Sequence, residues 1–220
     1  AVKSMGRPTI SAIIEERTNN GEFHSMQDFI TRMAGVINKR TVEHLIFAGA
    51  FDTFGHTRRG MLNVYERMID SAVKQNKDAI SGQMSLFDLV SEEDKQSLEM
   101  KIPDISEFEK EDLLEREKEV LGVYVTGHPL DEYTGMWEKH VSARSTDFLI
   151  DEETGETKAA DSTKQTIGGL VRNIKVNTTK TGQQMAYLTI EDFVGSVEVI
   201  LFPKAYEKNR RVLDMTNKVF

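Results

Sequence analysis

Residues 38–52 read Asn38-Lys39-Arg40-Thr41-Val42-Glu43-His44-Leu45-Ile46-Phe47-Ala48-Gly49-Ala50-Phe51-Asp52. Val42, Leu45 and Ile46 recur at the spacing of one helix face, and asparagine is a favoured residue just before a helix. The pattern therefore predicts a helix over Lys39–Phe47 that ends in a tight turn. Two interpretations of the turn stay open. Gly49 either permits a helix-hairpin-helix turn that faces a phosphate, or it simply ends one helix of a bundle.

Helical patterns continue on both sides of this segment. Apolar stripes predict helices over Thr9–Arg17, Ser25–Met33 and about Thr57–Gln75. Met5-Gly6 precedes the first of these helices, so a second glycine turn is expected there. We expect residues 1–75 to form one helical domain.

Cations surround both glycine turns. The start of a helix presents free N–H groups and a positive dipole end to a phosphate, and nearby cations add attraction that is independent of sequence. The alternative is that these cations are ordinary solvated side chains. The candidate DNA-binding residues are Lys3, Gly6, Arg7, Lys39, Arg40, Gly49, Arg58 and Arg59.

Residues 76–107 lose the helical periodicity and become acidic, which indicates a linker. Its hydrophobic concentration begins with Gln83-Met84-Ser85-Leu86-Phe87. Such a peptide can dock in an apolar pocket, with Gln83 bonded at the rim and Leu86 and Phe87 on the floor. The alternative is that Leu86 and Phe87 fold back onto the helical domain.

The remaining chain changes from helix to strand. Residues 108–163 are predicted to hold connecting helices, Ser106–Thr126 and Asp131–Lys139, with Gly127 ending the first, and a loop. Residues 164–220 are predicted to form strands at Thr166–Asn177, Met185–Asp192 and Ser196–Phe202, a helix at Lys204–Val212 and the start of a fourth strand near Asn217. This order is that of the first part of an OB-type barrel. The fold class is therefore α+β, with a helical domain, a linker, connecting helices and a partial, truncated OB-type β-barrel.

OB barrels bind single strands by stacking bases on aromatic rings in a basic groove. The candidates here are Arg172, Lys175, Lys180 and Phe193. The alternative is that the aromatic rings of this region fill the barrel.

Charge is divided unevenly along the chain, whose net charge is −8. Residues 1–80 carry 11 basic and 9 acidic side chains, residues 81–161 carry 8 and 22, and residues 162–220 carry 9 and 5. A polyanion is therefore expected at the two ends and repelled from the middle.

Several function classes are disfavoured. The chain has no cysteine, and its five histidines show no metal-ligand spacing, so we expect neither a metal site nor a cofactor. No nucleophile motif, phosphate loop or triad spacing is present, so we expect no catalytic residue. No apolar run is long enough for a membrane helix and no signal peptide is evident, which predicts a cytoplasmic protein without a membrane partner.

Four segments together resemble the C-terminal portion of the bacterial DNA polymerase III alpha subunit family. They are Ile13-Ile14-Glu15-Glu16-Arg17 with Phe29 downstream, Asn38 to Asp52, Gln83 to Phe87, and Glu115-Arg116-Glu117 through Leu121-Gly122 to Gly127-His128-Pro129-Leu130. They stand in the family's order, and the last leads into Thr166–Phe202, which resembles the family's OB domain.

The resemblance implies a tandem helix-hairpin-helix domain on duplex DNA and a downstream OB domain. Whether this OB domain binds single-stranded DNA, other replisome subunits or nothing stays open. It also implies that Gln83, Met84, Leu86 and Phe87 bind the sliding clamp, the beta subunit, and that the polymerase activity resides upstream of this fragment. One departure is that Ser4-Met5-Gly6-Arg7 stands where the family usually has Gly-x-Gly. The second turn is therefore the better supported of the two.

Two rival functions belong to other classes. An RNA-binding module of the tRNA type would share the strand pattern of Thr166–Phe202, but it leaves Gln83–Phe87 without a role. A clamp-recruited repair nuclease would need a carboxylate cluster, and Glu191-Asp192 points to opposite faces of a strand.

Overall fold

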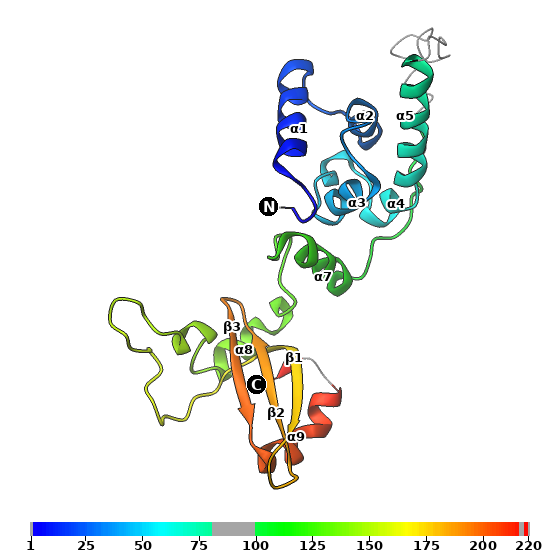
Figure 1. The fold of residues 1–220 in the computed structure, drawn as a ribbon. Helices are drawn as coiled ribbons and strands as arrows, with labels where there is room; N and C mark the ends of the chain where they lie inside the picture. Colours follow the sequence, from blue (N-terminus) through cyan, green and yellow to red (C-terminus); the bar gives the residue numbers. More distant parts are fainter. Residues whose placement is uncertain (1, 81–99, 216–217, 220) are drawn as a thin grey trace. The chain divides into compact units, whose positions relative to one another are not determined.

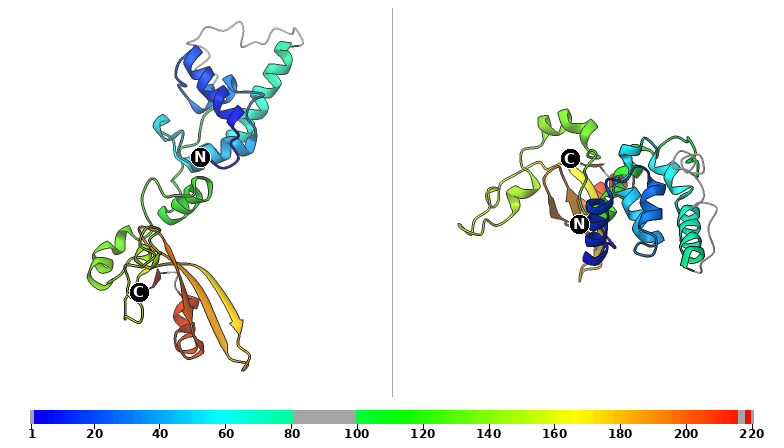
Figure 2. Two further views of the ribbon diagram at one scale, coloured as in Figure 1. Left: turned by 60° about the vertical axis from the view of Figure 1, so that its left-hand side comes forward. Right: turned by 90° about the horizontal axis from the view of Figure 1, so that it is seen from above.

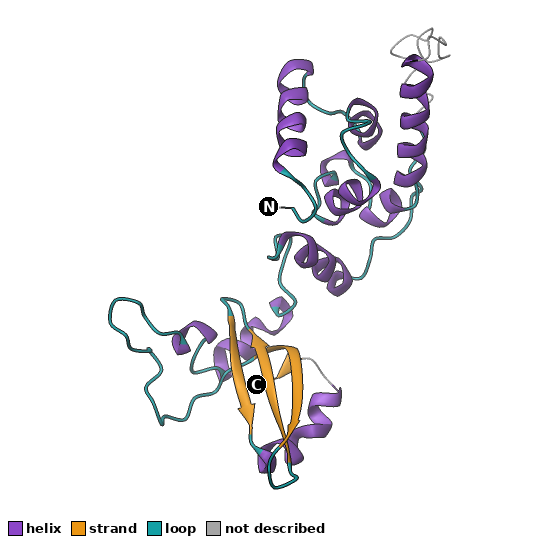
Figure 3. Ribbon diagram, in the orientation of Figure 1, coloured by secondary structure: helices purple, strands orange, loops and turns teal. Residues whose placement is uncertain are grey.

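The computed structural model describes residues 2–80, 100–215 and 218–219 (Figure 1). The chain divides into two compact units, Ala1–Gly127 and His128–Phe220. Figure 3 shows that the four strands lie in the second unit. The division falls inside the predicted connecting segment 108–163.

Short helices build the first unit. They are α1 (Arg7–Asn20), α2 (Met26–Arg32), α3 (Lys39–Phe47), the 3-10 helix η1 (Asp52–Phe54), α4 (Arg58–Leu62), α5 (Tyr65–Ile80) and α7 (Lys110–Leu121). The Ser25 hydroxyl accepts the backbone N–H of Asp28, and the Asn38 side chain accepts that of Thr41. The predicted starts of α2 and α3 are therefore confirmed, together with their cap residues.

The core of this unit lies among α2, α3 and α5. Its fully buried side chains include Met26, Ile30, Val42, Ile46 and Met61. Burying one such side chain stabilises the fold by about 1.5–3 kcal/mol. The predicted apolar faces of α2, α3 and the α4–α5 region are thus the ones that pack inward.

The prediction of one long helix over Thr57–Gln75 is wrong at its middle. The backbone N–H of Asn63 bonds to the Gly60 carbonyl at 3.1 Å, which tightens the last turn of α4. The Asn63 amide also donates to the Arg59 carbonyl at 3.0 Å. Asparagine competes with the backbone in this way, and α4 therefore ends before α5 begins at Tyr65.

The prediction that a helix continues to Thr126 is also wrong. Helix α7 ends at Leu121 because Gly122 adopts a left-handed conformation with φ +81° and donates to the Lys118 carbonyl at 2.7 Å. The backbone N–H groups of Val125 and Thr126 bond instead to the Glu117 carboxylate, at 2.7 and 3.0 Å. Glu117 is fully buried, and these loop N–H groups supply the hydrogen bonds that its buried carboxylate needs.

Both described ends of the predicted linker, residues 76–80 and 100–107, belong to the helical unit, so the linker prediction is wrong at its two ends. Residues 76–80 are the last residues of α5. The backbone N–H of Met100 donates to the Gln27 side chain at 2.6 Å, and the Thr57 hydroxyl donates to the Ile105 carbonyl at 3.0 Å. Met100 and Ile102 also pack against the core. Residues 100–107 therefore belong structurally to the helical unit.

The second unit begins with η3 (Asp131–Tyr133), α8 (Thr134–His140) and η4 (Ser145–Phe148). An antiparallel sheet follows, made of β1 (Gly169–Thr178), β2 (Gln184–Glu191), β3 (Ser196–Leu201) and β4 (Lys218–Val219), with α9 (Pro203–Met215) between the last two strands. The strand order is β3-β2-β1-β4, and the sheet curls as a half-barrel (Figure 2). The predicted partial OB-type barrel is confirmed.

Helix α9 covers the buried face of the sheet. Ala186, Leu188 and Ile190 alternate along β2 and form the buried centre, and Tyr206 and Leu213 of α9 pack against it. This alternation is the strand period that the sequence predicted. The sheet therefore presents its other face and the end of β1 to solvent.

Candidate nucleic-acid interface

The turn before α1 is the first candidate surface. Ser4 has φ +68°, Gly6 is the N-cap of α1, and no side chain among the described residues caps it. A Cβ atom at Gly6 would meet only Pro8, at 3.5 Å, so the backbone is open to close approach. Lys3 and Arg7 are exposed beside it. Free N–H groups, a positive helix end and two cations make this turn suited to a phosphate.

The second candidate turn, at Ala48–Ala50, is held by the buried side chain of Arg58. Gly49 has φ +74°, and the Arg58 guanidinium is only 3% exposed. It donates to the Asp52 carboxylate at 2.6 and 3.0 Å and to the Phe47 carbonyl at 2.9 Å. Burial alone lowers the pKa of Arg58, but the bond to Asp52 and the nearby acidic charges outweigh it and raise that pKa. Arg58 therefore holds the turn together and does not lie on the surface.

A carboxylate of the protein itself occupies the start of α4. Glu107 accepts the backbone N–H of Arg58 at 2.6 Å and that of Arg59 at 3.1 Å, and the Thr57 hydroxyl accepts that of Gly60 at 3.0 Å. The N–H groups that a phosphate would use at this turn are therefore taken. The sequence favoured the second turn, whereas the open backbone N–H groups lie at the first.

A further turn, which the sequence analysis missed, lies between α2 and α3. Gly35 is exposed with φ +92°, and a Cβ atom there would meet nothing within 4 Å. Arg40 is exposed in the first turn of α3, and Lys39 bonds to Asp70 at 3.1 Å and to Glu66 at 3.3 Å. These two carboxylates raise the pKa of Lys39, Asp70 most. A single glycine between two helical patterns was the available signal.

The predicted DNA-binding residues thus differ in exposure. Lys3, Gly6, Arg7, Arg40 and Arg59 are exposed, Lys39 and Gly49 are partly buried, and Arg58 is buried. All of them lie in the helical unit. Their contacts with DNA stay predictions.

The four residues of the half-barrel that were predicted to bind single-stranded DNA differ in their exposure and contacts. The Arg172 Nε donates to the Glu191 carboxylate at 2.9 Å, so this guanidinium is engaged across β1 and β2. Lys175 and Lys180 are exposed. Two of the predicted cations therefore remain directed to solvent.

Phe193 packs inside the second unit. Its ring lies 4.8 Å from that of His128 and 5.4 Å from that of Trp137, edge to face in the second case. The Trp137 indole N–H donates to the Gly168 carbonyl at 3.0 Å. Phe193 therefore joins α8 to the β2–β3 turn.

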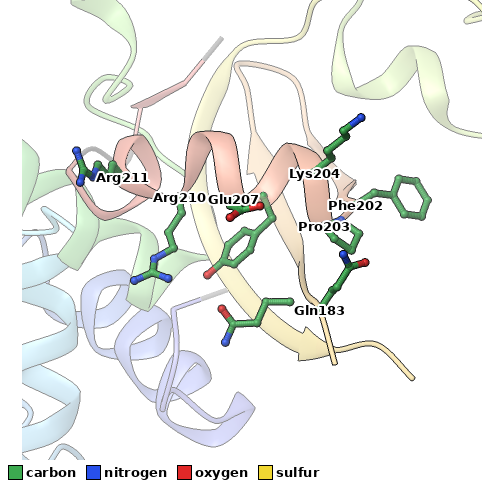
Figure 4. Close-up of a pocket in the computed structure, with 9 residues that line it drawn as sticks. Gln183, Phe202, Pro203, Lys204, Glu207, Arg210 and Arg211 are labelled. Atoms are coloured by element: carbon green, nitrogen blue, oxygen red, sulfur yellow. The ribbon is translucent and has the colours of Figure 1, made fainter. Parts of the chain in front are cut away.

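A hollow of about 870 Å³ beside α9 was missed by the sequence analysis (Figure 4). Phe202, which is 66% exposed, stands at one end of it, with Lys204 near it and Arg210 further along the helix. The lining residues are Gln183, Gln184, Phe202, Pro203, Lys204, Tyr206, Glu207, Arg210 and Arg211. Aromatic rings, amides and cations together suit a nucleotide strand.

Some predictions cannot be placed. Gln83, Met84, Leu86 and Phe87 lie outside the described residues. Among the residues that are described, no group of histidine and acidic side chains could hold a metal ion. Within the same ranges, no helix is long and apolar enough to cross a bilayer.

Comparison with known proteins agrees with this arrangement. A family model described as a helix-hairpin-helix motif matches residues 1–61. The DNA polymerase III subunit alpha of Saccharopolyspora erythraea is 34% identical over 212 residues, that of Vibrio cholerae 33% over 209 residues, and that of Escherichia coli strain K12 31% over 215 residues. These alignments cover 94%, 94% and 97% of this chain. The chain is homologous to the C-terminal part of DNA polymerase III alpha subunits.

The homology is extensive for this chain but limited for its relatives. The chain spans only 17–18% of the length of these three alpha subunits. The match to the helix-hairpin-helix model includes the turn before α1, the turn at Gly35 and the turn at Gly49. The three glycine turns described above therefore all lie in the part of the helical unit that the helix-hairpin-helix model matches.

Proposed function

We propose that this chain is a non-catalytic, DNA-binding part of a bacterial replicative DNA polymerase alpha subunit. It acts in the cytoplasm and holds duplex DNA by its phosphates, whatever the base sequence. The turn before α1 carries this proposal: Gly6 is open to close approach, and exposed Lys3 and Arg7 flank it. The homology and the helix-hairpin-helix match to residues 1–61 support it.

The energetics favour several weak contacts over one strong site. A helix start and one or two cations give a phosphate contact that carries no sequence information. Each such contact releases counterions and adds about 0.9 to the slope of log affinity against log salt. Linked contacts raise the effective concentration of one another, so loss of one does not release the chain.

The chain also binds the sliding clamp through Gln83–Phe87 in this proposal. The motif stands in an acidic stretch of the sequence that follows α5. Burying Leu86 and Phe87 contributes roughly 1.5–3 kcal/mol each, which suits a micromolar interaction after the costs of association. A tether of this kind keeps the polymerase on its template without strengthening its grip on any one site.

The half-barrel contacts single-stranded DNA beside α9. Phe202 offers an exposed ring for a base, and Lys204, Arg210 and Arg211 offer charge to the backbone. A base stacked on an aromatic ring contributes about 1–3 kcal/mol. Lys175 and Lys180 extend the basic surface along β1 and the turn after it.

Duplex binding is tested by fluorescence anisotropy with a random-sequence duplex over a series of salt concentrations. Replacing Lys3 and Arg7 by glutamine should lower the salt slope by about 1.8, two phosphate contacts, equally for unrelated sequences. Arg17→Gln, at the other end of α1, is the control and should leave the slope unchanged. Tighter binding of a tRNA than of duplex DNA would instead favour an RNA-binding function.

Clamp binding is tested by calorimetry with the purified beta subunit. The double variant Leu86→Ala, Phe87→Ala should lose measurable affinity because both apolar anchors are gone, while its duplex binding stays intact. Ser85→Ala, at a spacer position, should bind as the wild type does. Undiminished clamp affinity in the double variant would refute the assignment.

Single-strand binding is tested with oligo-dT. Phe202→Ala should weaken binding by roughly 5- to 150-fold, which corresponds to the loss of about 1–3 kcal/mol of stacking. Val212→Ala, an exposed apolar position on α9 that does not line the hollow, is the control. Equal affinities for the two variants would remove the hollow beside α9 from the interface.

A further inference from the structure

Ser4 holds a backbone conformation that serine rarely adopts. Its φ of +68° lies in the left-handed region, where glycine is at ease and other residues are strained. Such strain persists only when the surrounding structure enforces it. The first turn must therefore be held by contacts on either side of Ser4.

Two hydrogen bonds hold the residue before it. The Lys3 backbone N–H donates to the Val120 carbonyl of α7 at 2.8 Å, and the His44 Nδ1 lies 2.8 Å from the Lys3 carbonyl oxygen. A carbonyl oxygen carries no hydrogen, so His44 donates through Nδ1. His44 is 8% exposed and lies in the last turn of α3. A buried ring on a packed helix thus fixes the backbone of an exposed turn.

The Met5 backbone N–H also donates to the Val2 carbonyl at 3.3 Å and closes the turn within its own four residues. The contacts of the turn with the rest of the unit, apart from those of Lys3, are less directed. The Lys3 ammonium lies 4.0 Å from the Glu119 carboxylate, and both side chains are more than half exposed, so solvent screens this pair. Met5 is partly buried against the core, and an apolar contact of this kind sets no backbone angle. The directed restraint that α3 supplies therefore comes from His44.

We propose that His44 is a positioning residue for DNA binding. Its bond to Lys3 holds the strained Ser4 and thereby presents Lys3, Gly6 and Arg7 together to one stretch of DNA backbone. The inference rests on the proposed duplex binding and adds a residue that orients the DNA-binding turn. Histidine at position 44 compensates for the absence of glycine at position 4.

The test compares, in the full chain, two variants whose side chains have the same branching and the same number of heavy atoms. His44→Asn keeps a side-chain donor near the position of Nδ1, and His44→Leu removes it. Both variants lose the outer atoms of the imidazole ring, and they differ in whether a donor to the Lys3 carbonyl remains. His56→Leu, at an exposed histidine of the same unit, is the control.

The readout is the salt dependence of binding to a random-sequence duplex. Wild type, His44→Asn and His56→Leu should share one slope. His44→Leu should be shallower by at least one phosphate contact, about 0.9, which is about 8-fold in affinity at 0.1 M salt. Adding Ser4→Gly to His44→Leu should restore the slope, because glycine relieves the strain that the bond opposed.

The outcomes separate the two proposals. Equal slopes for His44→Asn and His44→Leu overturn the role of His44, and so does a loss that Ser4→Gly does not restore. A wild-type chain with no affinity for duplex DNA at low salt refutes the proposed function itself, before any variant is compared.

Discussion

Arg58 shows how the use of a basic residue depends on its partners. Its guanidinium bonds to Asp52 and to the Phe47 carbonyl, and the buried Glu117 carboxylate lies 3.8 Å from it. A buried cation is tolerated when acidic and carbonyl oxygens surround it in this way. The same charge that suggests a phosphate contact in the sequence therefore serves here to support the turn at Gly49.

We expect Gly49→Ala to destabilise the helical unit by about 3 kcal/mol. The left-handed conformation costs alanine about 1 kcal/mol, and the new methyl group would overlap the Arg58 guanidinium, which cannot move without leaving Asp52. Urea unfolding measures the change.

Gly55→Ala is the matched control for this prediction. Gly55 has φ +78°, and its Cβ atom would meet nothing within 4 Å, so only the backbone cost of about 1 kcal/mol applies. Equal losses for the two variants would mean that Arg58 does not restrain the turn.

Among the elements, α1 is held differently from its neighbours. It has no buried residue, and its C-terminal end is tied down by Arg32, which bonds to Glu16 at 2.8 Å and to the Gly21 carbonyl at 3.0 Å. The Arg32 guanidinium also lies 4.4 Å from the centre of the Phe23 ring. Ala12 and Ile13 are only partly buried against the core, so the polar contacts to one arginine supplement a weaker apolar packing than that of α2, α3 and α5.

We expect α1 to loosen in acid before the other helices. The bond from Arg32 lowers the pKa of Glu16, so this carboxylate stabilises the folded state fully above its ordinary pKa of 4.5. That stabilisation is lost as pH falls below 4.5 and through the lowered value. NMR line widths and chemical shifts should change in α1 over that range while α5 stays constant.

Arg32→Gln should remove this pH dependence and leave α1 loose at neutral pH. A helix α1 that titrates in the same way with and without Arg32 would contradict the prediction.

The elements also show what can be predicted from sequence. Helix α3 was predicted with its bounds because its signals are local: the Asn38 cap and one apolar stripe lie within the segment. The break after α4 depends on the side chain of Asn63, and the start of α4 depends on Glu107, which lies far along the chain. Burial of Arg58 likewise depends on distant partners, and exposure of Phe202 on how the sheet curls. The periodicity of apolar residues predicts which face of a helix is buried. It does not predict which distant residues bond to a given side chain.

At the scale of the whole chain, the division of charge does not follow the division of structure, because the acidic stretch crosses the boundary at Gly127. The candidate duplex-binding residues lie in the unit Ala1–Gly127, and most acidic residues lie between residues 81 and 161. In the proposed function, the acidic middle of the sequence repels DNA, and the proposed contacts lie in the segments on either side of it.

We expect residues 1–127 alone to fold and to bind duplex DNA with nearly the salt slope of the full chain. All the phosphate contacts proposed for duplex DNA lie within this unit, and it has its own core. Anisotropy measured on the two proteins side by side checks this. A fragment that folds but binds with a clearly shallower slope would show that the second unit shares in duplex binding.

The outer edge of β1 has a consequence for handling the protein. Strand β4 pairs only with Gly169 and Leu170, and in the part of the chain that the structure describes no strand continues along Val171–Thr178 on that side. Unsatisfied peptide groups along such an edge are a template for a strand of another molecule. The exposed apolar side chains of Ile174 and Val176 favour association through this edge. The charge of Lys175 between them repels the same lysine of a second molecule. Concentrated stocks should therefore stay monodisperse longest in low salt, where that repulsion reaches furthest.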